Sequence, residues 1–185
     1  MFKKIDLTVH TSKAKDFLLS DHGLWDQHNN RRTFNGSPHS EMVDIWARFG
    51  DVSGGDFSIL GREHDSVWYP SADLIPDIKE IAFQVMSSVN GERLGGILIT
   101  KLPAGGMIKP HVDSGWHAEY YEKFYVAISN PKGSYFCFEN DRIDAKDGDC
   151  YWFRNDVLHW VENRSDEDRI AMIVCIKTDM FSELK

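Results

Sequence analysis

The stretch from Leu102 to Asp113 reads Leu-Pro-Ala-Gly-Gly-Met-Ile-Lys-Pro-His-Val-Asp. Its first half, with one proline and two glycines, is typical of a turn, and its second half is typical of a short extended run. Residues i and i+2 of a β-strand point to the same face of a sheet, so His111 and Asp113 should project side by side. The pair predicts two ligands of a metal site.

A third ligand is expected from a later part of the chain. His159 lies within residues 155–163, Asn-Asp-Val-Leu-His-Trp-Val-Glu-Asn, in another β-rich run. Two histidines and one carboxylate form the facial triad of non-haem Fe(II) oxygenases, which leaves positions on the iron open for substrate chemistry and oxygen. We therefore expect His111, Asp113 and His159 to bind iron. His117 is a candidate fourth ligand, but a three-ligand site with open positions suits this chemistry better.

Short β-rich runs dominate the chain from residue 95 onward. Turns containing Gly, Pro, Asn and Asp separate them at roughly regular spacing, which is typical of an all-β sandwich or barrel. This spacing predicts a mainly β fold, a double-stranded β-helix of the jelly-roll, cupin-like kind, with a few flanking α-helices. The expected strands are Ile97–Leu102, Met107–Asp113, Phe124–Ser129, Ser134–Glu139, Asp149–Arg154, Leu158–Val161 and Arg169–Ile176. Ile5–Val9 and Val43–Phe49, in the first part of the chain, also have strand-like spacing.

The chain is expected to form one domain over residues 1–185, because no change in composition marks a second one. Residues 1–94 are predicted to be a helical and loop part that packs on a β core at 95–178. Within the first part, apolar residues recur every three or four positions over 71–89, and Asn90-Gly91 ends the run. This pattern predicts a helix whose apolar stripe lies on the outside of a sheet.

Composition and charge narrow the classes of function. The formal net charge is −8, and the clustered Lys and Arg that a nucleic acid requires are absent, so we expect no nucleic-acid partner. No apolar run approaches the roughly 20 residues of a membrane span, and no signal-peptide pattern follows the first residues. Cys137, Cys150 and Cys175 lie singly in apolar runs, as buried thiols in a reducing compartment do. A cytoplasmic protein without a membrane partner is expected.

A long polar loop over residues 21–40 is a further candidate for function, since long loops in compact domains are often functional. Arg31, Arg32, His39 and Arg48 lie in or just after it. Because an Arg side chain can bind a carboxylate through two hydrogen bonds, Arg32, His39 and Arg48 are candidates for binding an anionic substrate group. Pairing with neighbouring acidic residues is the alternative. Trp116, in the loop after the first ligand pair, is either a substrate contact or rim packing.

These motifs resemble the aspartyl/asparaginyl β-hydroxylase-like group of Fe(II)- and 2-oxoglutarate-dependent oxygenases, with the resemblance covering about residues 95–176. In that group His-x-Asp on one strand and a later His hold the iron, and His111, Asp113 and His159 occupy those places. The group also has an Arg ten residues after the distal His, which binds the far carboxylate of 2-oxoglutarate. Arg169 stands at that position, and the polar turn between the two predicts neighbouring antiparallel strands.

The chain departs from the group's pattern in two places. An Arg-x-His that helps to hold the cosubstrate is matched by Lys123 and Tyr125, both able to donate hydrogen bonds to a carboxylate. On a strand they can instead simply alternate with apolar neighbours. Animal members that act on Asp and Asn have Gly in place of the triad carboxylate. This chain keeps Asp113, as do three-ligand bacterial relatives such as free-proline hydroxylases.

The resemblance implies an enzyme that uses Fe(II), O2 and 2-oxoglutarate. It would hydroxylate an amino acid, or an amino-acid side chain of a peptide or protein, and release succinate and CO2. Its substrate would be a small molecule or peptide with an anionic group. An alternative is a metal-binding cupin, an isomerase or small-molecule sensor, which would need the triad but not Arg169. A purely structural jelly-roll, in which the histidines are incidental, is a third possibility.

Overall fold

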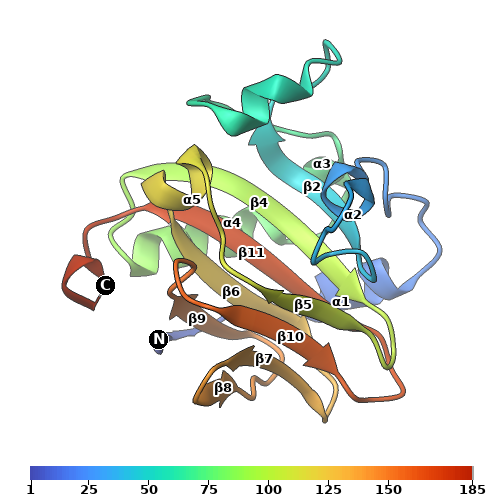
Figure 1. Ribbon diagram of the computed structural model, residues 1–185. Helices are drawn as coiled ribbons and strands as arrows, with labels where there is room; N and C mark the ends of the chain where they lie inside the picture. The colour runs from blue at the N-terminus through green and yellow to red at the C-terminus, as the bar shows by residue number, and fades with distance from the viewer. Residues whose placement is uncertain (185) are drawn as a thin grey trace.

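Two antiparallel β-sheets that face each other form the centre of the protein (Figure 1), whose residues 1–184 are described by a computed structural model. Over these residues the larger sheet contains, in spatial order, β1 (Phe2–Thr8), β9 (Asp149–Phe153), β6 (Glu122–Ser129), β11 (Arg169–Lys177), β4 (Arg93–Leu102), β2 (Val43–Gly50) and β3 (Ser66–Trp68). The smaller sheet contains β5 (Met107–His111), β10 (His159–Asn163), β7 (Ser134–Phe138) and β8 (Asp141–Ile143). The predicted double-stranded β-helix is confirmed.

The helices are short, and two of them, α1 and α4, pack on the outer face of the larger sheet. The helical segments are α1 (Ser12–Leu19), α2 (Asn30–Thr33), α3 (Ser71–Leu74), α4 (Ile78–Ser88) and α5 (Trp116–Tyr120), with 3₁₀ turns η1 (Phe57–Gly61) and η2 (Ser182–Leu184). Within residues 1–184 we find no helix with the length and apolar character needed to span a membrane.

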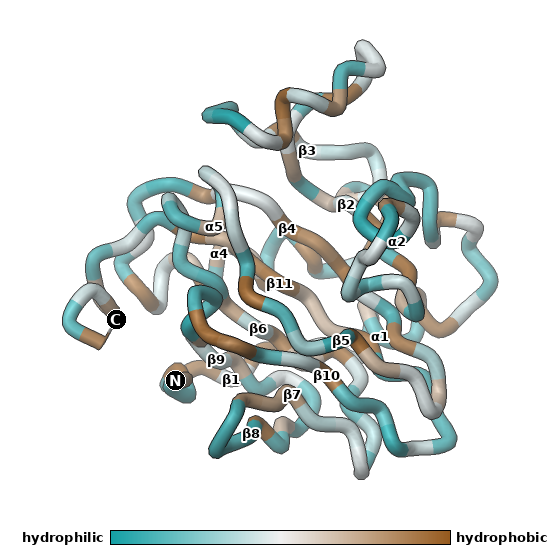
Figure 2. The backbone as a smooth tube through the Cα atoms, in the orientation of Figure 1, coloured by the Kyte–Doolittle hydropathy of each residue, from teal (hydrophilic) through white to brown (hydrophobic). Residues whose placement is uncertain are grey.

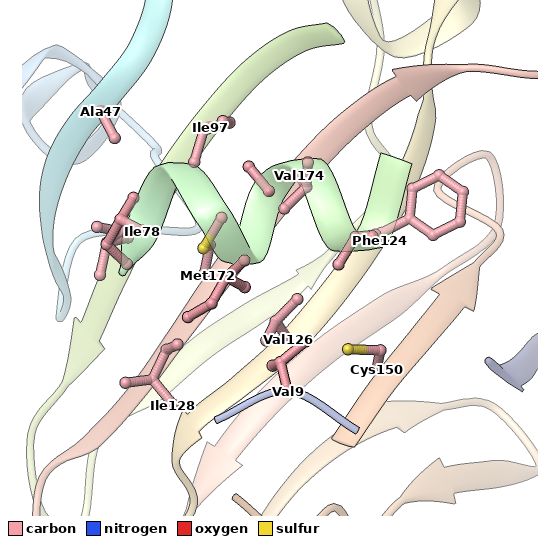
Figure 3. Close-up of a cluster of buried hydrophobic side chains, with 14 of the residues drawn as sticks. Val9, Ala47, Ile78, Ile97, Phe124, Val126, Ile128, Cys150, Met172 and Val174 are labelled. Atoms are coloured by element: carbon pink, nitrogen blue, oxygen red, sulfur yellow. The ribbon is translucent and has the colours of Figure 1, made fainter. Parts of the chain in front are cut away.

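The alternation of side chains along the central strands divides the interior into two layers. On β11, Met172 and Val174 belong to the apolar core under the helices (Figure 3), whereas Ala171 and Ile173 face the space between the sheets. Consecutive residues of a strand point to opposite faces, so one sheet can pack helices on one side and line a cavity on the other. Figure 2 shows that hydrophobic residues gather along the central strands of the larger sheet, whereas many of the connections are hydrophilic.

The apolar stripe of the predicted helix at 71–89 lies against the sheet as expected, but the segment forms two helices, α3 and α4, and the stripe belongs to α4. Ile78, Ile81, Ala82 and Val85 of α4 are buried. Between α3 and α4 the backbone of Asp77 has a φ of 62°, a left-handed conformation that an α-helix interior does not contain. The turn at residues 75–77 therefore separates a short first helix from the one that packs on the sheet.

Two strands, β3 and β8, were not predicted, because each has only three residues, too few for a periodic pattern. The N-terminal part also differs from a layer of helices and loops. It supplies β1, β2 and β3 to the larger sheet, so residues 1–94 build part of the sheet on which the site depends.

Replacing Ile81 with Ala should lower the free energy of unfolding by about 2–5 kcal/mol, because its side chain is only 1% exposed between α4 and the sheet. Chemical denaturation followed by circular dichroism measures the change. Ser87→Ala on the exposed side of the same helix is the control, with an expected change within about 0.5 kcal/mol. Equal effects of the two variants would contradict the assigned packing.

Candidate metal centre

The three predicted metal ligands lie together at one end of the smaller sheet. His159, the first residue of β10, is the cross-strand partner of His111, the last residue of β5. Their ring centres are 4.4 Å apart. The ligand atoms of His111, Asp113 and His159 all lie within 4.8 Å of one another. Two imidazoles and one carboxylate at this separation fit a facial triad for iron.

Backbone carbonyls orient both imidazoles for metal binding. The Nδ1 atom of His111 lies 2.7 Å from the Lys109 carbonyl oxygen, and the Nδ1 atom of His159 lies 2.8 Å from that of Val157. A carbonyl oxygen can only accept, so each Nδ1 carries a proton and the Nε2 atom is the one left to bind a metal. Burial also lowers the pKa of His159, which favours the neutral ring that a metal requires.

The backbone that carries the Asp113 carboxylate is held by the segment that precedes β10. The Asp113 backbone N–H donates to the carbonyl oxygen of Asn155 at 2.9 Å. The side-chain amide of Asn155 donates in turn to the Ala118 carbonyl oxygen at 2.8 Å. Asn155 thus connects the loop carrying Asp113, the helix α5 and the approach to His159. Sequence reasoning missed this residue, because a single Asn next to an Asp gives no signal beyond that of a turn.

A cavity of about 470 Å³ extends from the triad between the two sheets. Its walls come from both sheets and from the loop that precedes β2. Apolar and aromatic side chains make up much of the lining, which is typical of sites for small molecules. The charged and titratable residues that line it are Arg31, His39, His111, Asp113, His117, Lys123, His159, Arg169 and Cys175.

Arg169 is a buried cation in this cavity, only 2% exposed. Its Nε donates to the side-chain oxygen of Asn130 at 3.2 Å, and its guanidinium lies 5.1 Å from the ring centre of Tyr125. Within residues 1–184 no carboxylate lies within 4.0 Å of Arg169. A buried charge is costly unless it is paired. This cation therefore fits the role of a binding site for an anion such as the far carboxylate of 2-oxoglutarate.

Lys123 is a second cation on the same inner surface, half-buried where Arg169 is buried. Its Nζ donates to the sulfur of Cys175 at 3.3 Å. Burial by itself lowers the pKa of Lys123, but the nearby Cys175 and Asp113 outweigh burial, so the pKa is raised and the ammonium stays charged. Tyr125 does not line the cavity and lies behind Arg169, where its hydroxyl donates to Asn130 at 3.1 Å.

Of the four residues predicted to bind substrate, His39 alone lines the cavity. Its ring centre is 4.8 Å from that of His111, and burial strongly lowers its pKa, which keeps the ring neutral. Arg32 pairs with Asp26, and Arg48 donates to the Leu94 carbonyl oxygen. These two arginines and Trp116 do not line the cavity.

The residue next to Arg32 does face the cavity. Arg31 lines it, and its guanidinium lies 3.3 Å from the ring of His39. Adjacent residues of a helical turn point about 100° apart, so only one of the two arginines on α2 can face inward. The sequence of a polar loop has no apolar periodicity to indicate which one.

His117 lies at the cavity but outside the triad. Its Nε2 accepts a hydrogen bond from the Gly96 backbone N–H at 3.2 Å. Burial lowers its pKa to about 2. With its Nε2 lone pair used in this way, His117 is a structural part of the wall rather than a fourth ligand.

The fold and the triad define a non-haem iron oxygenase of the double-stranded β-helix type. A family model described as aspartyl/asparaginyl β-hydroxylase matches residues 22–178. The chain belongs to the aspartyl/asparaginyl β-hydroxylase family. It is a dioxygenase that uses Fe(II), O2 and 2-oxoglutarate, as predicted.

Solved structures show the same fold at low sequence identity. A prolyl hydroxylase from Trichoplax adhaerens, in complex with a hypoxia-inducible factor peptide, has a TM-score of 0.58 at 14% identity, covering 100% of this chain and 86% of that one. A collagen prolyl hydroxylase from Paramecium bursaria Chlorella virus-1, in complex with 2-oxoglutarate, has 0.56 at 13%, covering 96% of each chain. A comparison with curated protein sequences found no significant match.

Replacing Asn130 with Leu should lower the free energy of unfolding by about 1–3 kcal/mol, because Arg169 and the Tyr125 hydroxyl would lose their shared acceptor. Denaturant titration measures the loss. Asn130→Asp keeps the acceptor for Arg169 but loses the amide N–H groups that donate to the Ser134 and Ala145 carbonyl oxygens, so it separates the two contributions. Should the Leu variant be as stable as the wild type, the Asn130 side chain does not hold Arg169.

Proposed function

We propose that His111, Asp113 and His159 hold Fe(II) and that Arg169 binds the far carboxylate of 2-oxoglutarate. The observation that carries the proposal is that one cavity contains both the triad and a buried guanidinium with no acidic partner within residues 1–184. A ligand with a carboxylate at each end suits a cavity with a metal site at one place and a cation at another. Lys123 adds a second positive charge for the cosubstrate.

The bound iron and 2-oxoglutarate supply the oxidising chemistry, in which O2 converts the cosubstrate to succinate and CO2 and one oxygen atom enters a C–H bond of the substrate. The chain binds the cosubstrate and the substrate, orients them and excludes water. The Nδ1–H bonds of His111 and His159 fix the direction of their Nε2 lone pairs. Asn130 and Tyr125 position Arg169, and the apolar walls limit access of water to the reacting atoms.

The substrate is proposed to be an amino acid, or an amino-acid side chain of a peptide, that carries an anionic group, with His39 among the residues that contact it. Membership of the family supports amino-acid chemistry. The names of two structural neighbours mention peptide or collagen substrates of those proteins. The cations at the cavity support an anionic group, whereas the net charge of −8 does not favour a nucleic acid.

We further propose that residues 1–185 form one catalytic domain located in the cytoplasm. The single-domain proposal is supported by β1, β2 and β3, which complete the larger sheet from the N-terminal part. The location is supported by Cys137, Cys150 and Cys175, which are buried free thiols, as suits a reducing compartment.

Adding Fe(II) and then 2-oxoglutarate to the apoprotein without oxygen should produce a weak visible charge-transfer band only when both are present. His111→Ala and Asp113→Ala should abolish Fe(II) binding and the band while leaving the circular dichroism spectrum unchanged, because each removes one of three ligands. His10→Ala is the control, because His10 is exposed and is not one of the three ligands.

The outcomes separate the candidate functions. Iron binding without the band would favour the metal-binding cupin over the oxygenase. Iron binding that survives both triad variants would remove His111 and Asp113 from the site.

Arg169→Ala should raise the apparent Kd for 2-oxoglutarate by about one to two orders of magnitude, in line with the loss of a charge-assisted hydrogen bond of roughly 1.5–3 kcal/mol. Titration of the anaerobic band measures it. Arg154→Ala, which changes an arginine that pairs with Asp156 and does not line the cavity, should leave the Kd unchanged. An unaltered Kd in Arg169→Ala would transfer the role to Lys123.

A further inference from the structure

Arg31 is a cation of the cavity that the proposed binding of iron and 2-oxoglutarate does not use. About 30% of its side chain is accessible, and it lines the cavity beside His39. Its Nη1 donates to a carboxylate oxygen of Asp44 at 2.7 Å. A guanidinium has five N–H donors in a planar fork, so the bond to Asp44 and the contact with the His39 ring leave further donors for a ligand.

The partner of Arg31 is itself firmly held. Asp44 lies on β2, its side chain is 3% exposed, and its other carboxylate oxygen accepts from the Thr100 hydroxyl at 2.9 Å. Thr100 lies on β4 and also lines the cavity. A cation fixed by a buried acid on the sheet is pre-organised, so little side-chain entropy is lost when it binds a ligand.

The charges of the site leave room for one more negative group. Asp113 is the only acidic residue among those described that line the cavity. Asp44 neutralises Arg31. Fe(II), Lys123 and Arg169 carry four positive charges, and Asp113 and the 2-oxoglutarate dianion carry three negative ones, so one positive charge is left. A substrate with one carboxylate balances this excess.

The same count disfavours a substrate with a free ammonium group. An ammonium in a cavity needs an acidic partner, and the single acid, Asp113, belongs to the triad. The cavity that Arg31 lines instead has apolar and aromatic side chains in its wall, among them Phe34, Trp46, Phe49 and Leu60. This wall suits an uncharged apolar body attached to the carboxylate.

We propose that Arg31 binds the carboxylate of an apolar substrate whose amine is acylated, that is, an N-acylated apolar amino acid or the C-terminal residue of a peptide. Both present the same chemistry, an α-carboxylate next to an amide. The inference rests on the proposed function, because the charge count includes iron and 2-oxoglutarate. It narrows the proposed substrates to compounds with an acylated amine and a free α-carboxylate, which excludes free amino acids and internal residues of a peptide.

The test measures binding of defined probes to anaerobic protein loaded with Fe(II) and 2-oxoglutarate, by isothermal titration calorimetry and by perturbation of the visible band. The probes are the N-acetylated forms of the apolar L-amino acids, the same amino acids with a free amine, and the N-acetylated amides. Tripeptides ending in an apolar residue, with a free or an amidated C-terminus, form the peptide arm. Binding should require the carboxylate and should be weaker by at least about tenfold for the free amine.

Arg31→Gln should raise the Kd of the bound N-acetyl probe by about 10- to 100-fold, with the Kd of 2-oxoglutarate unchanged. Arg32→Gln is the matched control, because this neighbour pairs with Asp26 outside the cavity. If loss of Arg31 unfolds the protein by leaving Asp44 unpaired, the double variant Arg31→Gln/Asp44→Asn removes both charges together and should show the same loss of probe binding.

Each result bears on the proposal in one direction. The proposal is wrong if the amides bind as tightly as the acids, or if the free amino acids bind as tightly as the acetylated ones. It is also wrong if no N-acetyl probe binds, or if the Kd of the probe is unchanged in a folded Arg31 variant. Stronger binding of the tripeptides than of the acetyl amino acids identifies a peptide end as the source. Failure of Fe(II) and 2-oxoglutarate themselves to bind would instead refute the proposed function.

Discussion

The antiparallel pairing of β5 with β10 is the constraint on which the site depends. Its register pairs Val161 with Ile108 and His159 with His111. A step of three residues on β5 therefore corresponds to a step of two on β10. In a regular strand Ile108 and His111 would point to opposite faces. The irregularity, next to Pro110, which has no N–H for the ladder, brings both to the cavity. The apolar packing between the sheets and the geometry of the triad therefore have one cause.

The cations between the sheets lower the stability of the folded protein, but they allow the cavity to bind an anionic ligand. Ile170 and Met172 of β11 pack under the helices, while Arg169, at the start of the same strand, is buried between the sheets without an acidic partner in residues 1–184. An apolar residue at this position would save the desolvation of a charge. The amide oxygen of Asn130 and the face of Tyr125 offset only part of this cost, so the protein keeps a strong preference for an anion at this point.

The sequence was sufficient for the features that depend on fixed spacing. His111, His159 and Arg169 lie on strands, where spacing determines the face, and Asp113 follows two residues after β5. Arg169 lies on the opposite sheet rather than on a strand next to β10, yet the structure brings all four to one cavity. The loop residues were not predictable in this way. Arg31 and Arg32 differ only in the direction of their side chains, which depends on how α2 packs. Asn130 and Asn155 form hydrogen bonds with backbone groups that are distant in sequence. The break before α4 depends on one left-handed residue, Asp77.

Net charge and local charge point in opposite directions in this protein, and the local arrangement decides what the cavity binds. The chain as a whole carries −8, yet the groups around the cavity are mainly cationic. Charges exposed to solvent are screened beyond about 8 Å at physiological salt, whereas buried ones are screened much less. The surface acids therefore contribute little inside, and Lys123 and Arg169 dominate the field that a ligand meets there. An acidic protein can thus present a cationic interior to a dianionic cosubstrate, and the role proposed for Arg31 applies the same principle to a carboxylate of the substrate.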